Sequence, residues 1–223
     1  MPKTFAPKFR VSNTRINYYA ALEQLEADYK LAKDKAVDTV WLLEHNHVYT
    51  AGSSAKDHDL LIGNSTKFKA VPVVKTVRGG QFTYHGPGQK VVYLTINLDN
   101  LFDGKALDIR KLVQAYEQLV INVLAKLGIK GERRAGRIGI WVAENNTEAK
   151  ITAIGLRVRK KITSHGFCLN INPDLSYYQG IVPCGISEYG VTSVKQLLGE
   201  VPKDEMVNKL IESEVELLQK LLS

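Results

Sequence analysis

Apolar residues recur along this chain at helical spacing in three regions. Between residues 14 and 33 they fall three or four positions apart, which predicts an amphipathic helix with one side formed by Ile16, Tyr19, Leu22, Leu25 and Tyr29. A second long helix begins at Asp108 and ends at Gly128, a typical C-cap residue. The C-terminal region predicts a short helix after Thr192 and an amphipathic helix over residues 204–222.

Shorter apolar runs between these helices predict strands, and Asn145-Asn146 marks a turn. The predicted strands cover residues 38–44, 71–77, 90–98, 138–143, 151–159 and 162–171. Strands and helices do not alternate regularly, so a doubly wound parallel sheet is disfavoured. We expect one α+β domain over residues 1–223, with mixed strands flanked by helices.

The composition is ordinary for a globular protein, with 44% hydrophobic and 24% charged residues. The apolar runs are too short to span a membrane, and the N-terminal residues lack the apolar core of a secretory signal. The first 22 residues carry basic groups and no acid, as a transit peptide does, but the first predicted helix leaves little to remove. We therefore expect a cytoplasmic protein.

The net charge of +7 and the pI near 9.3 favour an acidic partner. The basic residues are spread along the chain, and the densest group, residues 157–161, fits the solvated face of a predicted strand. The sequence has neither zinc-finger spacing nor an aromatic–basic RNA-binding motif. Nucleic acid is therefore disfavoured as a partner, and an acidic protein fits the same charge.

Residues 78–89 form the most unusual segment, RGGQFTYHGPGQ, in which four glycines and a proline accompany a cation, an imidazole, a phenol and two amides. Glycine lets the backbone approach a ligand closely, and polar loops between strands often carry binding groups. An ordinary long hairpin loop is the alternative, and composition does not decide between them. The segment matches neither a Walker A loop nor a dinucleotide-binding fingerprint.

The two cysteines, Cys168 and Cys184, do not make a disulfide framework. Cys184 lies between Pro183 and Gly185, where the amides of Gly185 and Ile186 would face a substrate carbonyl as in an oxyanion hole. A reactive thiol and a small buried side chain both fit this context. Cys168 lies in an alternating strand, and we expect it to be a core or pocket-lining residue.

A nucleophilic cysteine needs a nearby cation or base, because a thiol is mostly protonated at neutral pH. The candidates are His85, His165 and Lys150, which opens an apolar run and would be desolvated there. An ordinary solvated lysine is the alternative, so the residues alone do not select Lys150. His45 and His47 lack further ligands at suitable spacing, so a metal site is disfavoured.

Four motifs follow one another along the chain: RGGQFTYHGPGQ, AKITAIG, HGFCLN and GIVPCGI. Their order and spacing resemble the lipoyl(octanoyl) transferases, from about the first predicted helix to a little beyond Cys184. Thr50-Ala51-Gly52 and residues 139–142 support the resemblance.

The resemblance implies the fold of the biotin and lipoate ligases (class II aminoacyl-tRNA synthetase/biotin synthetase-like), a mixed sheet flanked by helices with a smaller second sheet. It implies an acyltransferase that moves octanoyl from acyl carrier protein to a specific lysine of lipoyl domains, the first step of lipoate attachment. Those domains belong to the E2 subunits of 2-oxo-acid dehydrogenases and to the glycine-cleavage H protein. Neither ATP, nor a metal, nor another cofactor is implied.

The resemblance also assigns roles to residues. Cys184 matches the acyl-thioester nucleophile, and Lys150 matches the lysine that activates this cysteine and transfers protons. The substrate-binding stretches match Arg78, Gly79, Gly80, Gln81, Phe82, Thr83, Tyr84, His85, Ala153, Ile154, Gly155, Gly166, Phe167 and Cys168. The family usually has alanine in place of Cys168, which implies a tighter pocket but no new nucleophile. Residues 53–57 also depart from the family pattern.

Other functions remain as alternatives. An ATP-dependent lipoate- or biotin-type protein ligase would share the fold, but Cys184 in its turn and the lack of a glycine-rich adenylate loop disfavour it. A non-catalytic binder of carrier protein or nucleic acid would use the basic surface alone. A cysteine hydrolase is disfavoured because no His–Cys–Asx set stands out.

Overall fold

The computed structural model describes residues 5–35, 37–63, 65–102, 106–144, 147–182 and 189–222. Within these ranges a mixed eight-stranded sheet has the order β1-β2-β6-β10-β9-β8-β7, with β11 paired to β9. The central pairs are antiparallel, whereas β1–β2 and β11–β9 are parallel. The strands are β1 Lys8–Val11, β2 Thr39–Leu43, β6 Gln89–Thr95, β7 Glu132–Arg134, β8 Arg137–Glu144, β9 Thr147–Arg159, β10 Ile162–Asn170 and β11 Gly190–Val191.

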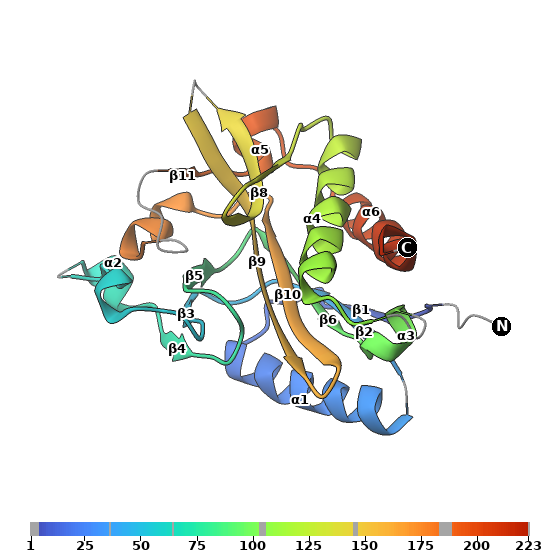
Figure 1. Ribbon diagram of the computed structural model, residues 1–223. Helices are drawn as coiled ribbons and strands as arrows, with labels where there is room; N and C mark the ends of the chain where they lie inside the picture. The colour runs from blue at the N-terminus through green and yellow to red at the C-terminus, as the bar shows by residue number, and fades with distance from the viewer. Residues whose placement is uncertain are drawn as a thin grey trace.

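A second sheet of three strands lies beside the first in the described part of the chain (Figure 1). Its central strand is β3 (Val48–Ala51), which pairs in parallel with β4 (Val73–Lys75) and antiparallel with β5 (Phe82–His85). The mixed main sheet and the smaller second sheet confirm the predicted α+β fold class. The alternation of residues did not predict β1, β3, β5, β7 or β11.

Helices cover both faces of the larger sheet (Figure 1). α1 (Tyr18–Lys35) lies along one face, and α4 (Ile109–Lys126) lies on the other together with α6 (Asp204–Glu216). Side chains alternate along β6, so Val91 and Tyr93 join the hydrophobic cluster under α1, whereas Val92 and Leu94 join the larger core under α4. Two separate hydrophobic clusters therefore hold the central sheet.

The long helix starts where the sequence predicts it. The Asp108 carboxylate accepts hydrogen bonds from the amides of Arg110 and Lys111 and caps α4. Gly128 follows the helix with a φ of 80°, a conformation that glycine adopts without strain. The predicted short helix after Thr192 is α5 (Val194–Leu198).

Two predicted helix boundaries are wrong. The helix predicted over residues 14–33 begins at Tyr18, because Ile16 forms a parallel bridge with His45 and cannot be helical. The helix predicted over residues 204–222 is two helices, α6 and α7 (Leu218–Leu221), which meet at Leu217.

Four short elements were not predicted because each is too short to show a helical period. They are α2 (Thr66–Lys69), α3 (Leu98–Phe102) and the 3₁₀ turns Asp57–Asp59 and Leu175–Gly180. In the part of the chain that the structure describes, no helix has both the length and the apolar character needed to cross a membrane.

Candidate active site

A cavity lies where the smaller sheet, the cluster under α1 and strands β9 and β10 meet. It contains about 460 Å³ of space free of atoms, including its open mouth. Its lining comes from α1, from the segment that includes β5, and from β6, β9 and β10. The lining residues are Tyr18, Arg78, Gly80, Gln81, Phe82, Thr83, His85, Val91, Tyr93, Ala153, Ile154, Gly155, His165, Gly166, Phe167 and Cys168.

Strand pairing brings the distant motifs together in this cavity. Cys168 on β10 lies opposite Val91 of β6 on one side and Ala153 of β9 on the other. Gly166 lies opposite Gly155 in the same way. The three stretches predicted to bind substrate therefore meet around one space, and all but Gly79 and Tyr84 of the predicted binding residues line it.

Glycine at position 155 lets the segment before β5 cross close to β9. A Cβ atom there would lie 2.9 Å from the Gly79 carbonyl oxygen, closer than real Cβ contacts allow. The Gly79 amide donates a hydrogen bond of 3.0 Å to the Leu156 carbonyl oxygen. This crossing connects the smaller sheet to the larger one and covers the cavity.

The Arg78 guanidinium holds this segment in place. Its Nη2 donates to the Thr50 carbonyl oxygen at 2.6 Å and to the Gln81 carbonyl oxygen at 2.9 Å, and its Nη1 donates to the Gly79 carbonyl oxygen at 3.0 Å. Arg78 is buried, so this cation lies in an environment of low polarity next to the cavity.

Buried histidines next to the cavity are held in the neutral form. Burial lowers the pKa of His165 to about 3 and that of His45 to about 4, and it lowers the pKa of His85 well below its ordinary value. The Nδ1 of His85 donates to the Gln89 side-chain oxygen at 2.6 Å, since that oxygen can only accept. His85 is therefore a neutral imidazole with its second nitrogen able to accept a proton.

His45 and His47 belong to separate hydrogen-bond networks. The Nδ1 of His45 donates to the Ile16 carbonyl oxygen, so its Nε2 accepts from the Tyr93 hydroxyl at 2.7 Å. His47 contacts the Tyr84 hydroxyl through its Nδ1. Over the described residues, no group of three or more His, Cys, Asp or Glu side chains is arranged to hold a metal ion.

Lys150 is brought to the cavity face of β9 by a β-bulge. Ile140 pairs with Thr152 whereas Trp141 pairs with Lys150, so Ile151 is an extra residue in β9. Without the bulge, Lys150 and Ala153 would point to opposite faces, because side chains alternate along a strand. With it, both point to the same face of the sheet.

The Lys150 side chain is buried and has few polar neighbours. Its Nζ donates a hydrogen bond of 3.0 Å to the Ile138 carbonyl oxygen and lies 4.8 Å from the centre of the Trp141 ring. Among the described residues, no carboxylate forms an ion pair with it. The solvated lysine that the sequence left open is therefore excluded.

Cys184, together with Gly185 and Ile186, lies outside the described residues. The chain before it is held by the Val182 amide, which donates to the Asp59 carbonyl oxygen at 2.7 Å. The chain after it continues as β11, in which Val191 pairs with Lys150. The strand that follows the predicted nucleophile thus runs beside the predicted activating lysine.

The chain matches the family model of the lipoyl protein ligase A/B catalytic domain over residues 17–215. It is 46% identical to an octanoyltransferase of Rhodospirillum rubrum over 208 residues, covering 92% of each chain. It is 44% identical to an octanoyltransferase of Wolbachia pipientis, covering 88% of this chain and 92% of the relative.

The chain belongs to the octanoyltransferase family. It is therefore an acyltransferase that transfers octanoyl groups in protein lipoylation. The predicted family resemblance and enzyme class are confirmed, and the ATP-dependent ligase is the less supported reading.

Solved structures with low identity share its fold. A bipartite lipoate protein ligase of Thermoplasma acidophilum is 13% identical with a TM-score of 0.68, and the match covers 96% of this chain and 84% of that one. A lipoate-protein ligase A structure with bound ATP is also 13% identical with a TM-score of 0.68, covering 95% and 85%. The predicted lipoate-ligase fold is confirmed.

Some lining residues of this acyltransferase were missed by sequence reasoning, namely Tyr18, Val91 and Tyr93. Val91 and Tyr93 lie in a predicted strand, but only its pairing with β10 places them beside Cys168. Tyr84, which was predicted to bind substrate, stacks on Tyr177 at a distance of 5.0 Å on the other side of β5.

Proposed function

We propose that this chain, as a single catalytic domain over residues 1–223, moves octanoyl from acyl carrier protein to a lipoyl-domain lysine through a thioester on Cys184. The observation that carries the proposal is the position of Lys150. A buried ammonium without a carboxylate partner among the described residues faces the same side of the sheet as Ala153 and Cys168 of the cavity wall. Such a cation favours a thiolate beside it.

In the first half-reaction, the thiolate of Cys184 attacks the carbonyl carbon of the carrier-bound thioester. The tetrahedral oxyanion is held by the amides of Gly185 and Ile186, as the sequence predicts. The carbon–sulfur bond to the carrier then breaks, and the leaving thiolate takes a proton from Lys150. Exchange of one thioester for another has little driving force, so positioning supplies the rate enhancement.

In the second half-reaction, the neutral amine of the acceptor lysine attacks the Cys184 thioester. Its nitrogen forms an amide with the octanoyl carbonyl carbon, and the cysteine leaves as a thiolate. The proton released by the amine goes to Lys150, which gave up its proton in the first half-reaction, or to the neutral His85. Both half-reactions balance without ATP or a metal.

The cavity is proposed to hold the octanoyl chain. Each methylene group buried against apolar walls contributes about 0.8 kcal/mol to binding. The walls offer Phe82, Val91 and Ala153 for these contacts. We assign the predicted binding stretches, Arg78 to His85, Ala153 to Gly155 and Gly166 to Cys168, to this role.

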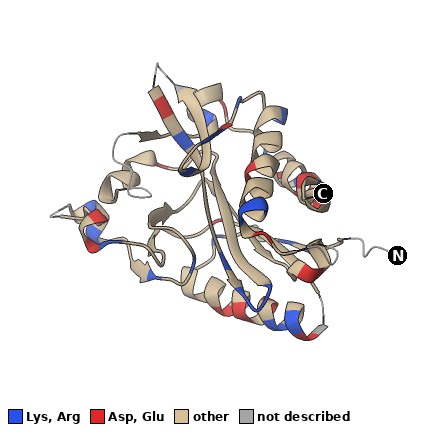
Figure 2. Ribbon diagram, in the orientation of Figure 1, with Lys and Arg blue, Asp and Glu red and all other residues tan. Residues whose placement is uncertain are grey.

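The partners proposed are octanoyl acyl carrier protein and the lipoyl domains of 2-oxo-acid dehydrogenase E2 subunits and glycine-cleavage H protein. The net charge of +7 suits acidic proteins of this kind. In the view of Figure 2, Lys and Arg are spread over several elements. A cytoplasmic location remains a prediction.

A donor comparison tests the proposal against an ATP-dependent ligase. Octanoyl acyl carrier protein alone should support octanoylation of an isolated lipoyl domain, whereas free octanoate with ATP and Mg²⁺ should not. Product is measured by the mass increase of the lipoyl domain. Activity with octanoate and ATP in the absence of carrier protein would refute the proposal.

A further inference from the structure

Trp141 lies directly opposite Lys150 in the β8–β9 pair, and its ring faces the lysine. The Lys150 Nζ is 4.8 Å from the ring centre, within the range of a cation–π contact. Trp141 is 1% exposed, so water does not weaken this contact. An indole is the aromatic ring that attracts cations most strongly.

Several contacts fix the orientation of this indole. Its Nε1 donates a hydrogen bond of 3.0 Å to the Arg137 carbonyl oxygen. The Arg137 guanidinium carbon lies 4.5 Å from the Trp141 ring centre and 4.1 Å from the Tyr189 ring centre, so this cation packs between the two rings. Tyr189 meets the edge of Trp141 at 5.5 Å.

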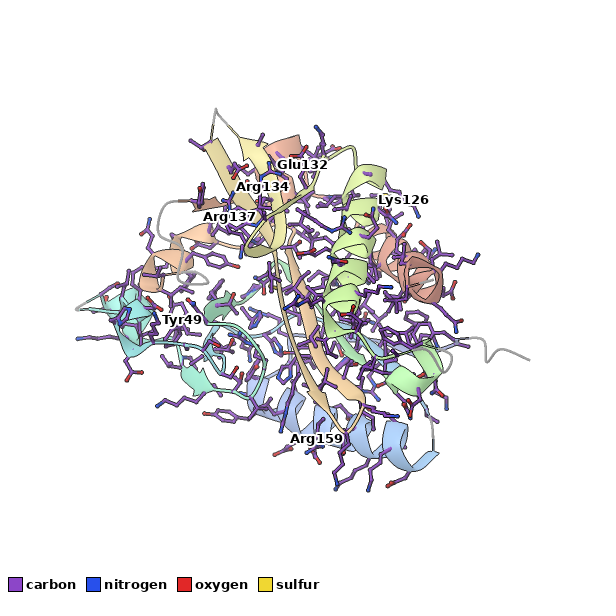
Figure 3. The ribbon with its side chains drawn as sticks, viewed as in Figure 1. Tyr49, Lys126, Glu132, Arg134, Arg137 and Arg159 are labelled. Atoms are coloured by element: carbon purple, nitrogen blue, oxygen red, sulfur yellow. The ribbon has the colours of Figure 1, made fainter. Side chains whose placement is uncertain are left out.

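Arg137 already has a carboxylate partner. Its Nη2 lies 2.5 Å from a Glu148 oxygen, and Arg134 binds the other Glu148 oxygen. Figure 3 shows Arg134 and Arg137 with Glu132 at this end of β7 and β8. Glu148 is thereby paired with two arginines, and within the described part of the chain the Lys150 ammonium contacts the indole and one carbonyl oxygen.

Beside the lysine, β8 passes close to the β9 backbone at Gly139. A Cβ atom there would lie 3.5 Å from Cε and 3.6 Å from Nζ of Lys150, and 2.4 Å from the Thr152 carbonyl oxygen. The φ of Gly139 is 114°, which side-chain-bearing residues rarely adopt. Glycine is therefore needed here for the close approach of β8 to β9 next to the lysine.

We propose that Trp141 is a positioning residue that holds the Lys150 ammonium at the point where protons are exchanged. This inference rests on the proposed function. A carboxylate would hold the ammonium more firmly and compete for its proton. The face of an indole attracts the cation but cannot accept a proton. Lys150 can therefore exchange its proton with the thiol, the leaving thiolate and the incoming amine.

The experiment measures the rate at which iodoacetamide alkylates Cys184 between pH 5 and pH 10, read by peptide mass spectrometry so that Cys168 is counted separately. Lys150→Met gives the rate without the cation. In Trp141→Leu the alkylation rate of Cys184 at neutral pH should fall about three- to tenfold, towards the rate in Lys150→Met. The midpoint of the pH dependence of this rate should move to higher pH. Trp141→Phe keeps an aromatic face, so its alkylation rate and midpoint should lie between those of Trp141→Leu and the wild type.

Trp41 offers a matched control. It is also a buried indole with a guanidinium over its ring, that of Arg10 at 5.3 Å, and its Nε1 donates to the Ser12 hydroxyl. Trp41→Leu should lower the melting temperature as Trp141→Leu does but leave the alkylation midpoint unchanged. Thermal melts of all variants separate loss of folding from loss of positioning. If Trp141→Leu does not fold, the alkylation rate and midpoint of Trp141→Phe test the positioning role instead.

The outcomes distinguish the two proposals. If Lys150→Met shifts the alkylation midpoint but neither Trp141 variant does, the positioning role is wrong and the proposed function stands. The same conclusion follows if Trp41→Leu shifts the alkylation midpoint as much as the Trp141 variants do. If Lys150→Met leaves the midpoint at the wild-type value, or if octanoyl carrier protein leaves no octanoyl group on Cys184 of the wild type, the proposed function fails and the positioning role fails with it.

Discussion

At the scale of single residues, Cys168 shows how one atom shapes the cavity. Its side chain is 3% exposed and lines the cavity between Val91 and Ala153. The sequence predicted a pocket-lining or core residue here, because the strand around it alternates. The sulfur takes up space that an alanine side chain would leave open.

Cys168→Ala should therefore shift the acyl-chain preference towards longer chains. Removing one buried heavy atom makes room for about one methylene group, worth about 0.8 kcal/mol, so the nonanoyl-to-octanoyl ratio of kcat/KM should rise about fourfold. Cys168→Ser conserves the volume and should keep the wild-type ratio. Loss of octanoyl transfer in both variants would instead indicate that Cys168 takes part in the chemistry.

The buried histidines predict how stability depends on pH. In the unfolded chain they bind protons below about pH 6.5, whereas His45 and His165 stay neutral in the folded chain down to about pH 4 and about pH 3. The unfolded state thus binds more protons as pH falls, and the free energy of unfolding decreases from about pH 6.5 towards pH 4. Each group contributes at most about 1.4 kcal/mol per pH unit.

Urea unfolding at pH 7.5, 6 and 5 measures this slope. His165→Asn removes one titrating group and should reduce the slope, and asparagine tolerates the φ of 62° at this position. An identical slope in wild type and His165→Asn would contradict this account.

At the scale of elements, the bulge in β9 turns the Lys150 side chain to the same face of the sheet as Ala153. Sequence alone could not show it, because a bulge is defined by the pairing of two strands and not by the residues of one. The run from 151 to 155 predicted a regular strand, in which Lys150 and Ala153 would face opposite sides. The motifs in the sequence therefore indicated which lysine is involved, but not to which face of the sheet its side chain points.

Gly139→Ala tests the importance of this geometry. The added Cβ would meet the Thr152 carbonyl oxygen at 2.4 Å, so we expect a loss of about 2–3 kcal/mol in the free energy of unfolding and a lower kcat. Gly136→Ala is the matched control. Gly136 also has a positive φ, of 75°, but nothing lies within 4 Å of its Cβ position.

Urea unfolding and octanoyl-transfer assays measure the two effects. Gly136→Ala should cost only about 1 kcal/mol, the conformational strain, and should keep the wild-type kcat. Equal losses of stability and equal kcat values in the two variants would show that the close approach of β8 to β9 at Gly139 does not matter.

The smaller sheet was only partly predictable. Its strand β4 lies within the predicted strand 71–77, but β3 and β5 have four residues each and lie beside polar and glycine-rich segments. All four residues of β5 are buried although the surrounding segment reads as a loop. Tertiary contact with β3 and the 3₁₀ turn Leu175–Gly180, not local preference, makes residues 82–85 a strand.

At the scale of the whole molecule, the pattern of strands and helices was enough to predict an α+β fold. The cavity was not predictable in the same way, since its walls come from α1, both sheets and the crossing segment at Arg78 and Gly79. Ordered motifs indicated which stretches meet, but strand pairing was needed to add Val91 and Tyr93, and the position of α1 was needed to add Tyr18.

The net charge predicts salt-dependent use of protein substrates. Raising the NaCl concentration from about 50 mM to about 500 mM shortens the range of charge interactions, so kcat/KM for octanoyl acyl carrier protein should fall several-fold. A neutral small-molecule octanoyl thioester should show little change. Steady-state kinetics with both donors measure the difference, and equal salt sensitivity would indicate that the basic surface does not guide the carrier.

The central claim is the thioester on Cys184, and intact-protein mass spectrometry after mixing with octanoyl acyl carrier protein tests it most directly. We predict that the wild-type chain gains the mass of one octanoyl group, that peptide mapping places it on Cys184, and that Cys184→Ser gains none. Addition of a lipoyl domain should then remove the group from the enzyme and transfer it to a domain lysine. An octanoyl group on Cys168, or full transfer activity in Cys184→Ser, would contradict the account.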